Sequence, residues 1–316
     1  MSGNNFLKLN NMDEVHEYVQ KRIMEEGHGH SSMDEVNKYA AEWMEIVNSR
    51  PLDKFDGCSP TEMQSVLYNL FGKGCPVQLN DFTLDDCAAV PLFRQVKLLL
   101  EIVNKENSVK LTTKGNLPLR IVKAMYDVGA PYHYIEVGMM HLRSEDNSIS
   151  VATAHIVTEI IIKAVKKRNN TLSITKKGKE LLTDDRKLLR ELLFAMLSSF
   201  NSAYFDGYSS KNIGIVGRGF SLILLARYGD IEREDSFYAD KYFDAFPMLM
   251  EEIDERYSPR EKIALYCYSL RIFDFLFYQL GLVTVEETDK YTATYKTIIR
   301  KTDLFNRLFK ILSPVK

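Results

Sequence analysis

The chain has 316 residues, 45% of them hydrophobic, and a formal net charge of −2 at pH 7. This length corresponds to roughly two or three domains or to one extended helical assembly. The near-neutral charge excludes a strongly basic nucleic-acid coat protein, so any contact with a nucleic acid has to come from a local basic patch. The polar N-terminus and the lack of an apolar run long enough to cross a bilayer predict a cytoplasmic protein with no membrane partner.

The cysteines and histidines give no metal-binding pattern. The cysteines show no C-x-x-C spacing: Cys58, Cys75, Cys87 and Cys267. Such cysteines predict reduced thiols and not a disulfide framework or a zinc site. His28 and His30 form an H-x-H pair without a third ligand nearby. We therefore expect neither a metal nor an organic cofactor.

Residues 1–50 are predicted to form an N-terminal helical segment. Apolar residues recur at helical spacing over 12–23. A second helix is expected to follow, with Ser32 or Asp34 as its N-cap and an apolar stripe that reaches Val47.

Residues 51–130 are predicted to form the first of three further units. Ser59-Pro60 indicates a helix start, because Ser is a good cap and Pro suits the first helical position. Thr83 with Asp86 indicates another capped start. An apolar stripe predicts a core-facing helix over 91–105: Val96, Leu99, Leu100 and Val103. A strand over 109–113 and a helix over 118–128 are expected to follow.

Residues 131–200 are predicted to form the second unit. An apolar helix is expected from Ile149 to Arg168, then a turn at Asn169-Asn170, a strand over 172–174 and a helix over 188–200. The stretches Val109-Lys-Leu-Thr-Thr-Lys-Gly115 and Leu172-Ser-Ile-Thr-Lys-Lys-Gly178 have the same order of residue types. We interpret them as the two copies of a degenerate internal duplication.

Residues 201–316 are predicted to form a C-terminal helical region that ends in a third unit. A loop over 209–219 is followed by helices over 220–228, 237–255 and 258–280. Strands over 282–285 and 294–300 then predict a hairpin, and a last helix is expected over 303–312.

Three segments carry a resemblance to a known architecture. Lys110-Leu-Thr-Thr-Lys-Gly-Asn-Leu-Pro118 and Ser173-Ile-Thr-Lys-Lys-Gly-Lys-Glu-Leu-Leu182 resemble the wing strand and following helix of tandem winged-helix proteins from bacteria. Ile299-Arg-Lys-Thr-Asp-Leu-Phe305 resembles a diverged version without the glycine. The run over 51–119 is also similar to bacterial proteins of uncharacterised function that join a Ser-Pro-x-x-Met helix to the first of these segments. The resemblance implies a mainly α fold with short β-hairpins, in which two or three diverged winged-helix units are joined by helical segments.

Basic residues gather around the second of these segments. Over residues 159–191 there are ten Lys and Arg against five Asp and Glu. A winged-helix unit would place its third helix in the major groove of DNA and such cations beside the phosphates. The expected nucleic-acid-binding residues are Lys163, Lys166, Lys167, Arg168, Lys176, Lys177 and Lys179. Hydrogen bonds to phosphate are expected from Asn169, Asn170, Thr171 and Thr175.

These features predict a non-catalytic binding protein with double-stranded DNA as its partner. One alternative is a winged-helix scaffold that binds another protein, which the acidic net charge and an aromatic-rich helix over 266–278 favour. Another alternative is that the cations form a solvated face and complement the dipole at the C-terminus of a helix.

No catalytic constellation is evident in the sequence. Gly214-Ile-Val-Gly-Arg-Gly219 resembles a phosphate-binding loop superficially, but it lacks the G-x-G-x-x-G order and a preceding strand. We expect a loop that connects two helices. His155 is expected at the surface or at its boundary, and no histidine has paired carboxylates at the spacing of a catalytic triad. We therefore expect no enzymatic activity.

Overall fold

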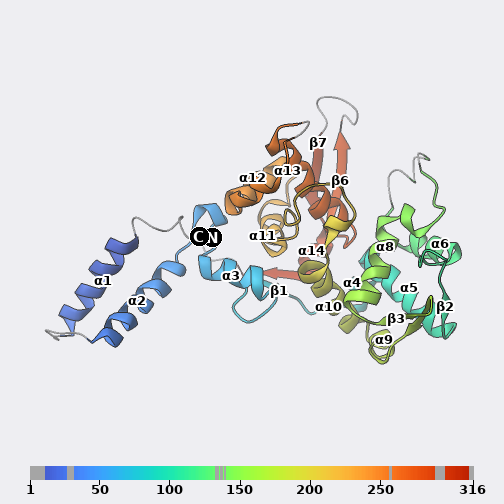
Figure 1. The fold of residues 1–316 in the computed structure, drawn as a ribbon, viewed down its shortest axis with the longest axis horizontal. Coiled ribbons are helices and arrows are strands. Elements are labelled where there is room, and N and C mark those ends of the chain that lie inside the picture. The colour runs from blue at the N-terminus through green and yellow to red at the C-terminus, as the bar shows by residue number, and fades with distance from the viewer. Residues whose placement is uncertain are drawn as a thin grey trace. The chain divides into compact units, whose positions relative to one another are not determined.

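A computed structural model describes residues 11–26, 32–131, 135, 138, 140–255, 258–288 and 296–312. The predicted H-x-H pair, His28 and His30, lies outside the described residues. The chain divides into two compact units, Met1–Gln64 with Pro314–Lys316 and Ser65–Ser313. The fold is mainly helical, with a few short antiparallel strands in small sheets (Figure 1). This confirms the predicted fold class at that level of detail.

The first unit contains the two helices predicted for the N-terminal segment, and they pack against each other. Its elements are α1 (Asn11–Glu25), α2 (Met33–Asn48) and η1 (Asp53–Phe55). Ser32 is the N-cap of α2: its side chain accepts a hydrogen bond from the Glu35 amide, and the Glu35 carboxylate accepts one from the Ser32 amide. This reciprocal capping box satisfies two amide groups that a helix start leaves without partners.

Two other predicted helix starts are confirmed as capping boxes. The Ser59 amide donates to the Glu62 carboxylate (2.7 Å) at the start of α3 (Pro60–Tyr68). Thr83 and Asp86 exchange equivalent bonds at the start of α4 (Leu84–Ala89).

The second unit contains one order of elements twice: helix, strand, helix, helix, strand, strand, helix. The first repeat, residues 91–182, consists of α5 (Pro91–Lys105), β2 (Val109–Lys110), α6 (Leu119–Val128), α8 (Ile149–Ile156) with its π-helical continuation η3 (Val157–Ile161), β3 (Val165–Arg168), β4 (Thr171–Ile174) and α9 (Lys176–Leu182). The second repeat, residues 218–308, consists of α11 (Arg218–Tyr228), β5 (Arg233–Glu234), α12 (Asp235–Ala245), α13 (Arg260–Ser269) with the π-helical η7 (Leu270–Phe277), β6 (Val283–Thr288), β7 (Lys296–Lys301) and α14 (Asp303–Leu308). The sheet orders correspond as well, β2-β4-β3 and β5-β7-β6.

Further elements connect and close the repeats. Before the first repeat lie α4 and β1 (Val77–Leu79), within it η2 (Glu145–Asn147), and between the repeats α10 (Asp185–Phe194), η4 (Ala195–Ser199) and η5 (Ser202–Tyr204). The predicted stripe of α5 is confirmed, because all of its members are fully buried: Val96, Leu99, Leu100 and Val103. Burial of such a stripe supplies much of the free energy that fixes a helix in a fold.

The interpretation of the two Thr-x-Lys-Gly stretches as separate copies of one unit is wrong. β2 of the first stretch pairs with β4 of the second, with Val109 opposite Leu172, so the stretches are neighbours in one sheet. Their glycines also serve different purposes. Gly115 adopts a left-handed backbone (φ 87°) in a turn, which favours glycine. Gly178 is needed because a Cβ there would overlap the carbonyl oxygen of Ala164.

The helix predicted from Ile149 to Arg168 is too long. The helical backbone ends after η3, Lys163 takes a left-handed conformation (φ 60°), and residues 165–168 form β3. Asn169 and Asn170 both have positive φ (48° and 56°), as a two-residue turn between twisted antiparallel strands requires. The sequence Val165 to Ile174 therefore folds as a tight hairpin, and its cations lie on a strand instead of at a helix end.

Two predicted boundaries near the C-terminus also differ. The helix expected over 237–255 ends at Ala245, and Pro247 begins a short 3-10 helix, η6 (Pro247–Glu252), because proline has no amide to continue the helical bonding. The helix expected over 303–312 ends at Leu308, and β8 (Phe309–Ile311) pairs with β1. The predicted hairpin is confirmed as β6 and β7, while residues 289–295 between them lie outside the described residues.

Candidate nucleic-acid interface

The side chains predicted to bind nucleic acid are all exposed. They lie on β3, on α9 and on the residue segment between η3 and β3. Lys163 follows η3, three cations lie on β3 (Lys166, Lys167 and Arg168), and three lie on α9 (Lys176, Lys177 and Lys179). Figure 1 shows β3 and α9 together at one end of the first repeat.

The hairpin that carries the β3 cations is fixed to the preceding loop. The Asn170 side-chain amide donates to the carbonyl oxygens of Leu111 (3.1 Å) and Thr112 (2.8 Å), and the Leu111 amide donates to the Asn170 carbonyl (2.9 Å). Thr175 donates to the Lys163 carbonyl (2.9 Å) and accepts from the Gly178 amide. Asn170 and Thr175, two residues expected to bind phosphate, are thus engaged in holding the hairpin and capping α9.

The register of the strands sorts the cations between the two faces of the sheet. Side chains that lie directly opposite one another, or two apart on one strand, share a face. Lys110, Thr171 and Arg168 are opposite one another across the three strands, and Lys166 is opposite Ser173. We name this set the cationic sheet face: Lys110, Lys166, Arg168, Thr171 and Ser173. Lys167 lies on the other face, where its amine approaches Gly115.

Lys110 and Ser173 were absent from the predicted binding set. The alternation of Val109 with Lys110 does show that Lys110 is on the solvent face of its strand. The pairing of β2 with β4 places Lys110 opposite Thr171, on the same face as Arg168. It joins residues far apart in the chain and leaves no local signal. The sequence analysis therefore identified the cations of the β3–β4 hairpin and missed the contribution of β2 to the same sheet.

Most of the predicted cations have no acidic partner among the described residues. Lys177 forms an ion pair with Glu191 (2.7 Å). In the same described part of the chain, no ion pair involves Lys163, Lys166, Lys167, Arg168, Lys176 or Lys179.

Neighbouring basic residues of α10 have other roles. The Arg186 guanidinium donates to the Phe82 carbonyl (2.9 Å), and Arg190 pairs with Asp81 (3.1 Å) while lying over the Phe82 ring. These arginines hold the segment before α4.

The third helix of the first repeat is mostly covered by its neighbours. None of residues 149–159 in α8 and η3 is exposed, and α8 packs against α5 and α6. The expectation that His155 lies at the surface is wrong: it is 5% exposed and its Nδ1 lies 2.7 Å from the Glu145 carboxylate. The same carboxylate accepts a hydrogen bond from the Leu117 amide (2.6 Å). This buried pair ties η2 to α8 and to the loop before α6.

The glycine-rich stretch is a helix-connecting loop over 214–217, and its last two residues, Arg218 and Gly219, begin α11. Gly217 is the N-cap of α11 in a left-handed conformation (φ 74°). A Cβ at Gly214 would overlap Arg271, and one at Gly217 would overlap the Phe246 ring. These glycines allow close packing of the loop against other side chains of the second repeat.

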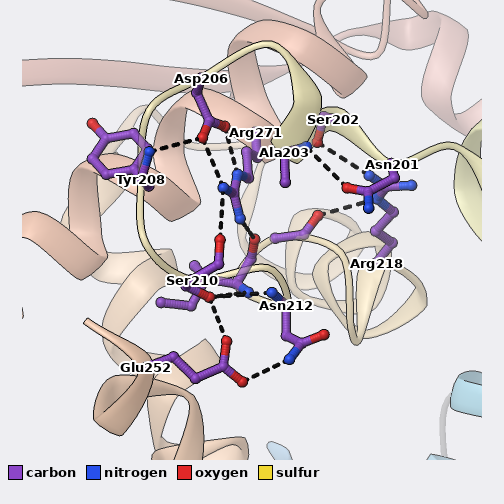
Figure 2. Close-up of polar contacts among 12 residues, drawn as sticks. Asn201, Ser202, Ala203, Asp206, Tyr208, Ser210, Asn212, Arg218, Glu252 and Arg271 are labelled. Carbon is purple, nitrogen blue, oxygen red and sulfur yellow. Dashed lines mark hydrogen bonds and ion pairs between the residues drawn. The ribbon is translucent and has the colours of Figure 1, made fainter. Parts of the chain in front are cut away.

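Two buried arginines of the second repeat organise that loop (Figure 2). Arg271, fully buried, forms a two-pronged ion pair with Asp206 (2.7 and 2.8 Å) and donates to the carbonyls of Ser210 and Ile213. Among the described residues, no carboxylate forms an ion pair with Arg218. Instead Arg218 donates to the carbonyls that end η4, from Met196 (2.8 Å) and Phe200 (2.5 Å), and to that of Gly214.

Burial lowers the pKa of Arg218 to about 10. The negative end of the η4 helix dipole and its free carbonyls offset part of the cost of that burial. Both arginines are therefore structural groups without access to a solvent-borne ligand.

The four cysteines are buried and have free thiols. Burial raises the pKa of Cys87 to about 11 and that of Cys267 to about 12. Within the described residues, no group of three or more His, Cys, Asp or Glu side chains is arranged to hold a metal ion.

None of the helices in the described part of the chain has the length and apolar character that crossing a membrane requires. No known protein family, curated protein or solved structure matches the chain.

Proposed function

We propose that the chain is a non-catalytic, winged-helix protein that binds double-stranded DNA through the first repeat. The order helix, strand, helix, helix, strand, wing, strand and the antiparallel sheet order β2-β4-β3 support the winged-helix assignment. In this assignment the hairpin of β3 and β4 is the wing. The same reasoning makes the second repeat a further winged-helix unit.

One observation carries the proposal: a rigid hairpin and the helix after it present exposed cations that are not neutralised by neighbouring carboxylates. A duplex carries about one negative charge per 1.7 Å of its axis, and displacing its counterions with Lys and Arg favours binding. A fixed hairpin loses little conformational entropy when it binds, which preserves that gain.

A winged-helix scaffold that binds another protein is the second candidate. The limited exposure of α8 favours it, because many DNA-binding folds insert the corresponding helix into the major groove, and no residue of α8 is fully exposed. The two functions differ in how binding responds to salt.

The test is a fluorescence titration of the full chain with a duplex of about two helical turns, roughly 20 base pairs. DNA binding predicts that affinity falls steeply between about 50 and 200 mM salt. Lys176→Ala/Lys177→Ala is expected to weaken binding a few-fold, with Lys176 the larger contributor because Lys177 already pairs with Glu191. A chain that binds no duplex at low salt would contradict the proposal and leave the scaffold candidate.

A further inference from the structure

The cationic sheet face combines three cations with two hydroxyl side chains. Its charged members are Lys110, Lys166 and Arg168, all exposed, and its central strand contributes the partly exposed hydroxyls of Thr171 and Ser173. None of these five residues is acidic, and no ion pair neutralises the three cations within the described residues. The face therefore offers positive charge and hydroxyl groups to a partner, and none of its five side chains is negatively charged.

The spacing of these groups is set by the backbone. Lys166 and Arg168 are two residues apart on one strand, so their Cα atoms are separated by about 6.6 Å. Lys110 and Arg168 are on the two edge strands, on either side of Thr171, so they are separated by two strand spacings or about 9.6 Å. Long side chains from such positions can reach successive phosphates of one nucleic-acid strand, and the Ser173 hydroxyl can donate to a phosphate oxygen. The Thr171 hydroxyl donates to the Asn169 carbonyl (3.4 Å).

The opposite face of the sheet holds this arrangement in place. Val109, Leu172 and Val165 are at most 1% exposed and anchor the three strands on the core. The Asn170 side chain fixes the turn, as described above. The donors are thus positioned before a partner arrives.

The third helix, which would contact the bases of a duplex, has few exposed side chains. Sequence is read in DNA mainly by side chains that enter the major groove, and no side chain of residues 149–159 is exposed. The next residue, Ile160, is 62% exposed, but it has no hydrogen-bonding group. Contact through the sheet face reaches phosphates, which carry no direct sequence information.

We infer that the cationic sheet face is the contact surface for the phosphate backbone of a duplex, and that it binds without reading base sequence. This inference rests on the proposed function and adds the surface and the mode of recognition. A lipid surface fits less well, since interfacial membrane binding needs apolar side chains beside the cations, and the face has none. The phosphates of a duplex can contact the three cations, which the paired strands hold on one face.

The test measures the affinity of the full chain for three duplexes of unrelated sequence and equal length, each about 20 base pairs. The inference predicts affinities within about twofold of one another, since phosphate contacts are sequence-independent. Lys166→Glu/Arg168→Glu is expected to lower all three affinities by more than about tenfold, because it replaces attraction to phosphate by repulsion.

The matched control removes two exposed cations of the same unit that lie away from the face, Lys73→Ala/Lys310→Ala, and predicts unchanged affinity. Because charge reversal can perturb folding, Lys166→Arg/Arg168→Lys serves as the conservative variant and is expected to keep most of the affinity. Circular dichroism of each variant reports whether the fold is retained.

Two outcomes would overturn the inference while leaving DNA binding intact: more than tenfold discrimination among the duplexes, or affinity that survives Lys166→Glu/Arg168→Glu. Tighter binding of the face to anionic vesicles or to polyglutamate than to duplex would overturn it in favour of a membrane or an acidic protein. If the unmodified chain binds none of the duplexes, that result would instead contradict the proposed function.

Discussion

The two repeats share a backbone plan and differ in where they place positive charge. In the first repeat the sheet face presents Lys110, Lys166 and Arg168 to solvent. In the second repeat the positions that correspond through the strand registers hold Glu234, Thr284 and Glu286. That face also has Arg300 and Lys296, and Lys296 pairs with Glu234. One sheet is thus purely cationic on its outer face and the other has mixed charge.

The buried parts of the repeats are much more alike. Thr175 and Thr302 follow the last strand of each sheet in the chain, and each hydroxyl donates to the carbonyl of a left-handed residue between the π-helical segment and the next strand, Lys163 or Gly281. Leu172 and Ile299 are fully buried at corresponding positions. The comparison teaches that core packing and this threonine hydrogen bond maintain the plan, while solvent-facing strand positions are free to acquire a different charge.

The repeats also differ in whether their arginines are buried or exposed. The second repeat buries Arg218 and Arg271, whereas Arg168 of the first repeat is exposed. A buried guanidinium needs partners on all sides, and a surface guanidinium does not. Mutations at the two kinds of site should therefore affect different properties.

The largest effect on stability is expected from Asp206→Asn. It leaves the fully buried Arg271 without its counter-charge, and breaking such a pair costs about 3–5 kcal/mol of unfolding free energy. Chemical denaturation measures the change. The control is Asp185→Asn, which breaks the partly exposed pair with Lys97 and is expected to cost about 1 kcal/mol or less. Equal costs for the two variants would contradict the assigned role of Arg271.

A smaller effect is expected from Gly178→Ala in the first repeat. The added methyl group would collide with the Ala164 carbonyl oxygen, and overpacking of this kind costs about 1–3 kcal/mol. In the second repeat Phe305 occupies the corresponding position, so close approach of helix to strand is a feature of the first repeat alone. Thermal unfolding measures the change, with Gly207→Ala as a control, because a Cβ there meets no atom within 4 Å and Gly207, like Gly178, is not left-handed. Unfolding midpoints for Gly178→Ala equal to the unmodified chain would refute the packing argument.

A gain of binding is expected when the second repeat is given the charges of the first. Glu234→Lys/Glu286→Lys makes the outer face of the second sheet cationic, so duplex affinity should rise several-fold and depend more steeply on salt. The titration described above measures it. The control Glu251→Lys/Asp303→Lys adds the same charge at exposed positions outside that sheet and should raise affinity less. Equal gains in the two variants would show that net charge, not the sheet face, controls binding.

The smallest effect is expected from Lys163→Gly, which gives the first repeat the left-handed glycine that the second repeat has between its π-helical segment and β6. Lys163 has φ 60° and Gly281 has φ 71°. A left-handed backbone costs a non-glycine residue about 1–2 kcal/mol, partly offset by the entropy that glycine loses on folding. Stability is therefore expected to rise by up to about 1 kcal/mol, and duplex affinity to fall about two- to threefold as one cation is lost. A variant that is less stable than the unmodified chain would contradict this reading of the backbone.

Local signals in the sequence predicted a good part of this structure. Capping pairs such as Thr83 with Asp86 and the stripe of α5 were identified correctly, because caps and helical periodicity act over a few residues. The predicted cations of β3 and α9 are all exposed, as a charge-rich stretch suggests.

The parts that could not be predicted depend on distant partners. The pairing of β2 with β4 joins Val109 to Leu172, and nothing near either residue specifies the other. The run of apolar residues from Ile149 favours a helix, and it is the hairpin pairing with β4 that makes residues 165–168 a strand. Burial of His155 likewise follows from Glu145, which a helical pattern does not reveal.

The central claim is that a duplex rests on the cationic sheet face of the first repeat. Lysine acetylation of the full chain with and without duplex tests it most directly, since bound phosphate shields an amine from the reagent. The account predicts that Lys110 and Lys166 become protected while Lys73 and Lys310 react as before. Under conditions where the duplex is bound, equal reactivity of Lys110 and Lys166 with and without it would contradict the account.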